Sequence, residues 1–116
     1  MGGAGSASLI RRKVVLRETA KADMRDLRTW IADQSNARTA DEYVSRLKSY
    51  LKKLGDVAEV GQRLDVLGPG IRSTNFEGRR RVIFAVQPRS VHIIRVVYSG
   101  RDLERVIAET DFDAEH

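Results

Sequence analysis

The chain has 116 residues, a net charge of +5 and 41% hydrophobic residues, which suits one folded domain and argues against disorder. It has no cysteine, which excludes disulfides and thiolate–metal sites and fits a reducing cytoplasm. No apolar run approaches the roughly 20 residues needed to span a membrane.

The first half of the chain predicts a strand and a helix. Residues 1–11 begin with a Gly/Ala/Ser-rich stretch without the features of a signal peptide, so we expect a flexible leader. Residues 12–17 are short and β-branched, which is typical of a strand. Thr19 is the expected N-cap of a first helix, and Ser35 and Asn36 are expected to end that helix and cap the next one. The apolar stripe of the first helix is Ala20, Met24, Leu27 and Ile31.

A second helix is predicted over residues 37–54, with Gly55 as its stop. Its apolar positions repeat the spacing of the first helix. They are Ala40, Val44, Leu47, Leu51 and Leu54. Two amphipathic helices joined by so short a link should form an antiparallel hairpin that buries its stripe against the rest of the chain.

The second half of the chain predicts a sheet. Residues 56–67 are expected to be irregular, and Gly68-Pro69-Gly70 is a strong break. Because the strands that follow are joined by short turns, they should be antiparallel neighbours. These strands are expected at residues 71–76, 80–87 and 91–98, with one or two helical turns at residues 102–108.

The expected order is therefore β-α-α-β-β-β, an α+β fold of two layers in which the helical hairpin packs on a small, mainly antiparallel sheet. We expect a single domain over residues 12–108, preceded by the leader at residues 1–11. Residues 109–116 carry four acidic side chains and are expected to form a disordered tail.

Charge indicates the kind of partner. When this acidic tail is set aside, 21 basic residues face only 12 acidic ones in the rest of the chain. Such a domain suits nucleic acid, an acidic protein or an anionic membrane surface. The alternative is a solvated surface that is simply rich in arginine.

Several local motifs together resemble the RelE/ParE toxin superfamily, and its ParE branch in particular. Residues 67–73 (L-G-P-G-I-R-S) resemble the entry to the sheet in ParE-like toxins, and residues 82–84 (V-I-F) resemble the next strand. Residues 93–103 (I-I-R-V-V-Y-S-G-R-D-L) resemble the last strand and the close that follows it. The helical hairpin matches in place and length, so the resemblance extends over residues 13–103.

The resemblance implies a cytoplasmic toxin of a type II toxin–antitoxin system, with growth inhibition and plasmid stabilisation as its roles. ParE-type toxins inhibit DNA gyrase, whereas RelE-type toxins cut messenger RNA, usually in the ribosome. Both are blocked by a cognate antitoxin, here expected to be ParD-like, acidic and folded on binding, which carries the complex to operator DNA. No cofactor, metal or membrane is implied.

Seven residues of the predicted sheet are candidates for target binding. They are Arg72, Arg79, Arg80, Arg81, Arg95, Tyr98 and Arg101. Alternation places Arg79 and Arg81 on one side of their strand and Arg80 on the other. It also places Arg95 on one face with Val91, Ile93 and Val97. A cation there needs a partner, so Arg95 either binds the target or forms an ion pair, with Asp102 or Glu104 as expected partners.

The alternative, RNA cleavage, needs a group that moves a proton and cations that hold the phosphate. His116 is terminal, and His92 is expected to be a half-exposed strand residue that alternates with Ile94, Val96 and Tyr98. Glu77 lies in a predicted turn, where a solvated carboxylate is the ordinary interpretation. Tyr98 stands where ParE-like toxins commonly carry histidine, yet a tyrosine hydroxyl with its intrinsic pKa of about 10 is a poor base.

We therefore expect a gyrase-binding toxin without catalytic residues. A ribosome-dependent endoribonuclease is the alternative, and its catalytic candidates would be Tyr98, Arg72, Arg81 and Arg95. A degenerate member that only binds antitoxin is the third interpretation. Lys52 and Lys53 add positive charge. Their favourable interaction with the dipole at the C-terminus of the predicted helix is sufficient to explain their presence. The sequence contains neither a phosphate-binding glycine loop nor metal-ligand spacing.

Overall fold

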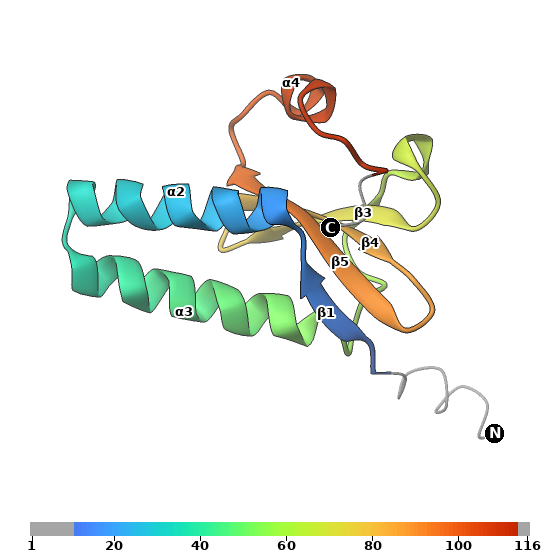
Figure 1. Ribbon diagram of the computed structural model, residues 1–116, viewed down its shortest axis with the longest axis horizontal. Coiled ribbons are helices and arrows are strands. Elements are labelled where there is room, and N and C mark those ends of the chain that lie inside the picture. Colours follow the sequence, from blue (N-terminus) through green and yellow to red (C-terminus); the bar gives the residue numbers. More distant parts are fainter. Residues whose placement is uncertain (1–10, 114–116) are drawn as a thin grey trace.

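The computed structural model describes residues 11–113 and has a five-stranded sheet in the order β1-β5-β4-β3-β2. A helical hairpin covers one face of the sheet and a short helix lies on the other (Figure 1). The elements are β1 (Lys13–Leu16), α2 (Glu18–Gln34), α3 (Ala37–Lys53), β2 (Gln62–Arg63), the 3₁₀ turn η1 (Asp65–Leu67), β3 (Ile71–Phe76), β4 (Arg80–Val86), β5 (Ser90–Tyr98) and α4 (Leu103–Ala108). The expected α+β architecture is confirmed. None of the helices in these residues is long and apolar enough to cross a membrane.

The two helices of the hairpin begin in different ways. The side chain of Asn36 accepts a hydrogen bond from the backbone N–H of Thr39 at 2.8 Å, so the predicted cap of α3 is confirmed. The predicted cap of α2 is wrong, because this helix begins at Glu18 and Arg17 occupies the N-cap without a side-chain hydrogen bond. The Thr19 hydroxyl instead donates to the carbonyl of Ile94 at 2.5 Å, which ties α2 to the sheet.

The end of α3 is set by a close approach to β1. Helix α3 ends at Lys53, and the backbone N–H of Arg12 donates to the carbonyl of Gly55 at 2.8 Å. A Cβ at Gly55 would lie 2.3 Å from the carbonyl oxygen of Arg12. A glycine is therefore needed at position 55 because β1 passes next to it. Gly55 also follows the end of α3.

The sheet is mixed. Strands β2, β3, β4 and β5 pair antiparallel, whereas β1 pairs parallel with β5, from Lys13 opposite Ser90 to Leu16 opposite Ile93. Strand β2 and the turn η1 lie in the stretch that we expected to be irregular. Both are too short to leave a periodic pattern in the sequence.

A β-bulge in β5 corrects the predicted face of Arg95. Ile83 pairs with Arg95 and Phe84 pairs with Ile93, so Ile94 is the extra residue. The bulge reverses the alternation of the strand at this point. Val91, Ile93 and Val96 pack on the hairpin side, and Ile94 and Val97 pack on the opposite side. The predictions that Arg95 shares a face with Val91 and Ile93, and that His92 alternates regularly with Ile94 and Val96, are therefore wrong.

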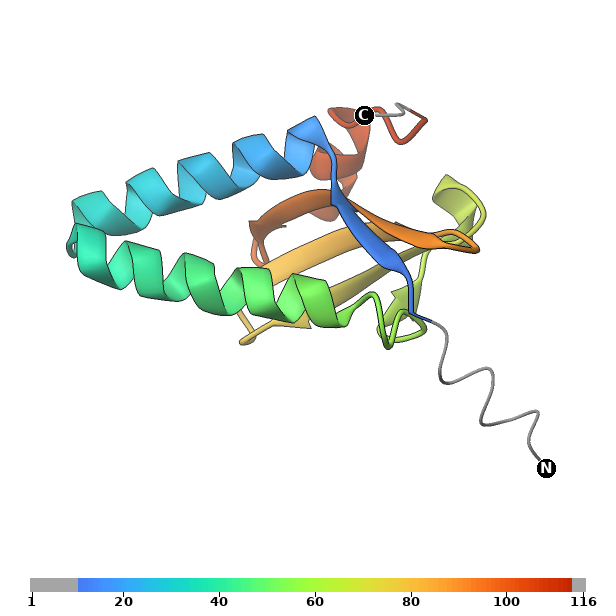
Figure 2. The same ribbon diagram turned by 60° about the horizontal axis from the view of Figure 1, so that its bottom comes forward.

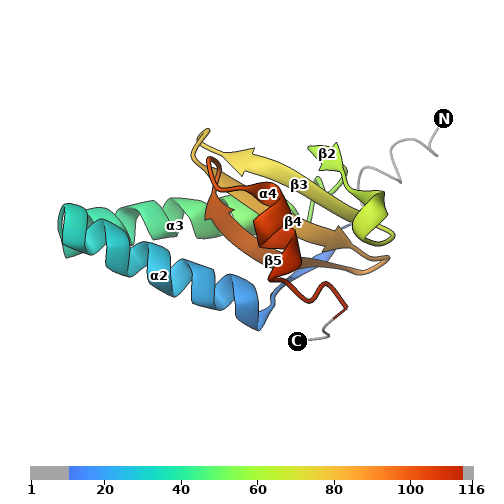
Figure 3. The ribbon, with the colours of Figure 1, turned by 90° about the horizontal axis from the view of Figure 1, so that it is seen from above.

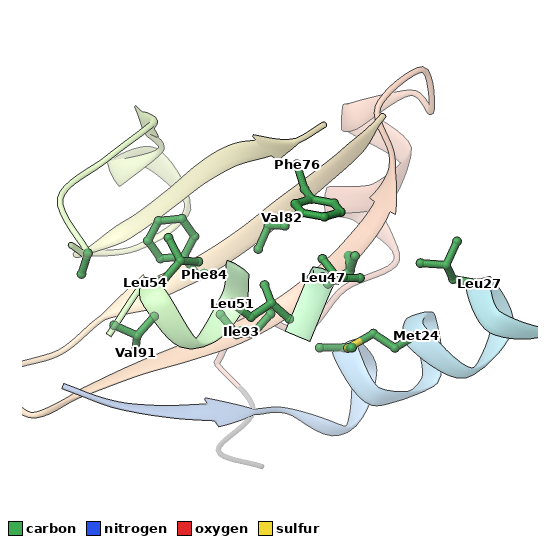
Figure 4. Close-up of a cluster of buried hydrophobic side chains, with 13 residues drawn as sticks. Met24, Leu27, Leu47, Leu51, Leu54, Phe76, Val82, Phe84, Val91 and Ile93 are labelled. Carbon is green, nitrogen blue, oxygen red and sulfur yellow. The ribbon is translucent and has the colours of Figure 1, made fainter. Parts of the chain in front are cut away.

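The sheet is apolar on both faces. The hairpin side holds the larger core, shown in Figure 4, in which Leu47 and Leu51 of α3 meet Phe84 and Ile93 of the sheet. On the other face, α4 lies across the strands (Figure 3), and Val106 is fully buried there. The sheet residues of this second cluster are Ile71, Ile83, Ala85, Ile94 and Val97.

The segment after α4 also lies against the domain. Phe112 packs on the second cluster, and its carbonyl accepts a hydrogen bond from the Arg17 guanidinium at 3.0 Å. Residues 109–113 were expected to belong to a disordered tail, but Glu109, Thr110 and Phe112 contact the domain, whereas Asp111 and Asp113 are exposed. The rest of that tail, with His116, and most of the expected leader, residues 1–10, lie outside the described residues.

Candidate functional site

An arginine and a tyrosine meet at one end of the sheet, on the hairpin side. Phe76 of β3 pairs with Arg80 of β4, which in turn pairs with Tyr98 of β5, so the three side chains form a row. The guanidinium carbon of Arg80 lies 5.7 Å from the centre of the Tyr98 ring, within cation–π range. Tyr98 is 59% exposed, although it ends a strand whose preceding five residues are buried.

The neighbouring turns bring two more candidates to this end. Arg79 is exposed in the β3–β4 turn, and its carbonyl accepts a hydrogen bond from the N–H of Ser99 at 2.8 Å. Arg101 follows β5, and its N–H donates to the carbonyl of Tyr98 at 3.0 Å. Arg79, Arg80, Tyr98 and Arg101 are thus brought to one end of the sheet, which we call the sheet-end site; Arg80 contacts the Tyr98 ring, and the Arg101 guanidinium is paired with Glu109. Gly100 packs so closely on Tyr98 that a Cβ there would lie 2.6 Å from the ring.

Arg81 and Arg72 are not part of the sheet-end site. Arg81 pairs with Val97, whose side chain packs on the α4 side, so Arg81 lies on the opposite face from Arg80. Arg72 lies further along β3, where its Nε donates to the carbonyl of Val60 at 2.8 Å. The structure therefore separates two of the proposed nuclease residues from Tyr98.

Arg95 forms a buried ion pair with Asp23. It is 8% exposed, and its guanidinium donates to both carboxylate oxygens of Asp23, at 2.8 and 3.0 Å. It also donates to the Thr110 hydroxyl at 2.7 Å and lies 3.6 Å from Glu109. The hydrogen bonds with Asp23 raise the pKa of Arg95 above its usual value. The side chain therefore joins α2, β5 and the C-terminal segment.

The predicted partners of Arg95 are wrong. Asp102 instead caps α4, where its side chain accepts a hydrogen bond from the N–H of Glu104, and Glu104 itself is exposed. Asp23 is 72 residues away in the sequence, so local spacing gave no signal for it.

Glu77 is held by a residue that the sequence did not indicate. Arg46 of α3 donates to both carboxylate oxygens of Glu77, at 3.0 and 3.2 Å, and these hydrogen bonds lower the pKa of Glu77. Arg46 also lies 5.2 Å from the ring centre of Tyr43, which contacts Phe76 edge-on at 5.6 Å. Tyr43 and Arg46 share a helix face by their spacing, but nothing local links them to a turn 31 residues later.

His92 lies apart from the sheet-end site. His92 is half-buried, and its Nδ1 accepts a hydrogen bond from Arg17 at 3.4 Å, near the other end of β5. Residues 11–113 contain no group of three or more His, Cys, Asp or Glu residues that could hold a metal ion.

The sheet-end site combines an exposed aromatic ring with the half-buried Arg80 and the exposed Arg79. Two carboxylates near its members are paired with arginine, Glu77 with Arg46 and Glu109 with Arg101. The hydrogen bonds from Arg46 lower the pKa of Glu77, so this carboxylate is a weaker base than a free one. The arrangement suits the binding of a polar or acidic surface better than the transfer of a proton.

Comparison with known proteins gives one family and one fold. Residues 14–103 match the family described as the ParE toxin of the type II toxin–antitoxin system parDE. A solved structure of the chromosomal ParDE toxin–antitoxin system from P. aeruginosa has a similar fold, with a TM-score of 0.65 and 20% sequence identity. That match covers 76% of this chain and 96% of the other. No functionally curated protein matches in sequence.

Proposed function

Because the chain belongs to the ParE toxin family of type II toxin–antitoxin systems, we propose that it is a toxin that inhibits DNA gyrase by binding it. The sheet-end site is the proposed contact with the target. The toxin would act in the cytoplasm, where gyrase acts on DNA.

The observation that carries this proposal is the exposed Tyr98 ring beside Arg80, with Arg79 exposed in the adjoining β3–β4 turn. Tyrosine and arginine are the residues that most often dominate protein–protein contacts. Glu77 of the β3–β4 turn and Glu109 beside Arg101 are each paired with arginine, which favours binding over cleavage.

A cognate antitoxin is the second proposed partner. An acidic, ParD-like chain that folds on binding suits a domain of net charge +5, because opposite charges steer the encounter. In this proposal the toxin reaches operator DNA only through the antitoxin.

The test of the target is DNA supercoiling. Gyrase, ATP and relaxed plasmid are mixed with the purified protein, and supercoiling is followed on a gel. We expect loss of supercoiling that the antitoxin reverses, and a much weaker effect of the variants Tyr98→Ala and Arg80→Ala. Arg89→Ala, an exposed arginine in the β4–β5 turn, is the matched control and should inhibit like the wild type. Full supercoiling at a large excess of toxin would rule out the gyrase proposal.

A ribosome-dependent endoribonuclease is the alternative, and the exposed Tyr98 beside a cation is the observation in its favour. The substitution Tyr98→Phe separates the two, since it keeps the ring over Arg80 and removes the hydroxyl. A gyrase-binding toxin should retain most of its toxicity, whereas a nuclease that uses this hydroxyl should lose it. Cleavage of ribosome-bound messenger RNA is the direct readout. A chain that neither inhibits gyrase nor cleaves RNA, but still binds antitoxin, would be a degenerate member.

A further inference from the structure

One flank of α2 begins on the sheet and continues beyond the end of β5. Four residues spaced three or four positions apart form a stripe along this flank: Thr19, Asp23, Asp26 and Trp30. The first two hold the strand. The Thr19 hydroxyl donates to the carbonyl of Ile94 at 2.5 Å, and the Asp23 carboxylate accepts from the N–H of Val96 at 2.8 Å.

The stripe and β5 run side by side in the same direction. Between these two hydrogen bonds α2 advances four residues, about 6 Å, and β5 advances two residues, about 6.6 Å. Since Tyr98 lies two residues beyond Val96, Leu27 is the residue of α2 that is level with it. Trp30 therefore lies about one helical turn past the level of Tyr98. Figure 2 shows the turn between α2 and α3 well beyond the ends of the strands.

Trp30 is exposed because the sheet ends before it. Its side chain is 57% exposed, and it is the single tryptophan of the chain. Asp26, one turn before it, is exposed and forms no ion pair within residues 11–113. The other flank of α2 is occupied, since Arg28 pairs with Asp41 of α3. A large ring and a free carboxylate are thus left on the flank that borders the sheet-end site.

We propose that the sheet-end site continues onto α2 through Asp26 and Trp30, and that this joint surface binds a protein. The partner would offer an apolar pocket to Trp30 and a cationic group to Asp26. Tryptophan, tyrosine and arginine are the residues that most often dominate such contacts, and the joint surface presents all three, with Tyr98 and Arg80 beside the new ring. The inference rests on the proposed function only for the identity of the partner, gyrase.

Charge favours a protein over a nucleic acid as this partner. Arg79 and Arg80 have the sign that suits phosphate. Asp26 and Asp33, however, place exposed carboxylates one turn before and one turn after Trp30, and neither forms an ion pair within the described part of the chain. A phosphate backbone that reached both rings would pass these carboxylates, and like charges repel. A protein surface can present both signs.

The first experiment removes the ring. The affinity of Trp30→Ala for immobilised gyrase is measured by surface plasmon resonance. We expect it to fall by at least about tenfold, while the melting temperature stays close to that of the wild type because the ring is largely exposed. The matched control is Val66→Ala, which is 92% exposed in η1, before β3, and should bind like the wild type. Unchanged affinity in Trp30→Ala would overturn the proposal.

Charge reversal then separates a protein from a nucleic acid. Asp26→Lys and Glu59→Lys change the net charge equally, and Glu59 is an exposed residue before β2. Gyrase should bind Asp26→Lys at least about fivefold more weakly and Glu59→Lys like the wild type. Equal losses in both variants would contradict the inference. Single-stranded RNA that binds Asp26→Lys more tightly than Glu59→Lys would place phosphate on this flank and overturn the proposal.

Growth inhibition separates this inference from the proposed target. If the wild type stops growth but leaves gyrase active, gyrase is not the target, and loss of growth inhibition in Trp30→Ala still supports the surface. If the wild type and Trp30→Ala inhibit gyrase equally, the inference is wrong and the proposed function stands. A wild type that does neither would overturn both. An effect of Trp30→Ala confined to self-association in the analytical ultracentrifuge, or to antitoxin binding, would give the ring another partner and overturn the inference.

Discussion

Arg80 and Arg95 lie on neighbouring strands, yet their surroundings give them different roles. Arg80 lies beside the exposed ring of Tyr98. Arg95 is enclosed, and its guanidinium contacts Asp23, Thr110 and Glu109. A target can therefore contact the surroundings of Arg80 directly, whereas Arg95 supports the fold on which that contact depends.

Removal of the Arg95 guanidinium should destabilise the domain strongly. The variant Arg95→Met leaves the carboxylate of Asp23 poorly solvated and without its cation, and breaking a buried pair of this kind costs about 3–5 kcal/mol. Urea denaturation followed by circular dichroism measures the free energy of unfolding. Arg105→Met, at an exposed position of α4, should change it by less than ~0.5 kcal/mol. A loss in Arg95→Met no larger than in this control would contradict a structural role for Arg95.

Glu77 should make stability depend on pH in the acidic range. Since Arg46 lowers the pKa of Glu77 in the folded protein, the pair stabilises the fold fully above the usual carboxyl pKa of about 4.3. This contribution is lost as the pH falls through the lowered value. Glu77→Gln should therefore unfold more easily than the wild type at pH 7, and the two melting temperatures should converge at low pH. A difference that is the same at both pH values would argue against the ion pair.

At the scale of elements, glycine is required on either side of β3 for different reasons, at Gly70 before the strand and at Gly78 in the turn after it. Gly78 has a φ of 68° with open space where a Cβ would be, whereas Gly70 has a φ of 80° and a Cβ there would lie 2.5 Å from the carbonyl oxygen of Val86. Gly78→Ala should cost about 1–2 kcal/mol from the backbone conformation alone. Gly70→Ala should cost more, because β3 and β4 must also separate. Thermal unfolding of the two variants checks this order, and equal losses would mean that the close approach is unimportant.

Elements with a long periodic pattern could be predicted from the sequence. The stripes of α2 and α3 and the cap at Asn36 agree with the structure, because each depends on residues a few positions apart. The cap of α2 could not be predicted, since the Thr19 hydroxyl is used by Ile94, 75 residues away. The bulge at Ile94 could not be predicted either, because an extra apolar residue in an apolar strand leaves no gap in the pattern.

Four of the seven predicted target-binding residues, Tyr98, Arg79, Arg80 and Arg101, lie at one end of the sheet, and their role in target binding stays a prediction. Their separation from Arg72 and Arg81 depends on strand register and on the face that each side chain takes. The ion pair of Arg46 with Glu77 joins a helix to a distant turn, and such contacts are determined only by tertiary packing.

At the scale of the whole molecule, the excess of positive charge should govern how fast partners bind. With 21 basic and 16 acidic residues, the protein should attract the proposed acidic antitoxin over a range that added salt shortens, from about 30 Å at 0.01 M to about 8 Å at 0.15 M ionic strength. The association rate constant, measured by stopped-flow fluorescence, should therefore fall steeply as salt is raised, while the dissociation rate changes less. An association rate that is flat with salt would contradict electrostatic steering.

The parallel pairing of β1 with β5 has a consequence for the synthesis of the protein. Strand β1 leaves the ribosome well before its neighbour in the sheet, since Lys13 lies opposite Ser90, far later in the chain. The hairpin of α2 and α3 needs only local contacts and can form while translation continues, whereas pairs so distant in the chain form late. Both the pairing of β1 and the row at Tyr98 therefore form only after β5 has been synthesised. A chain that stops before β5 lacks the sheet-end site and leaves β1 without its neighbour.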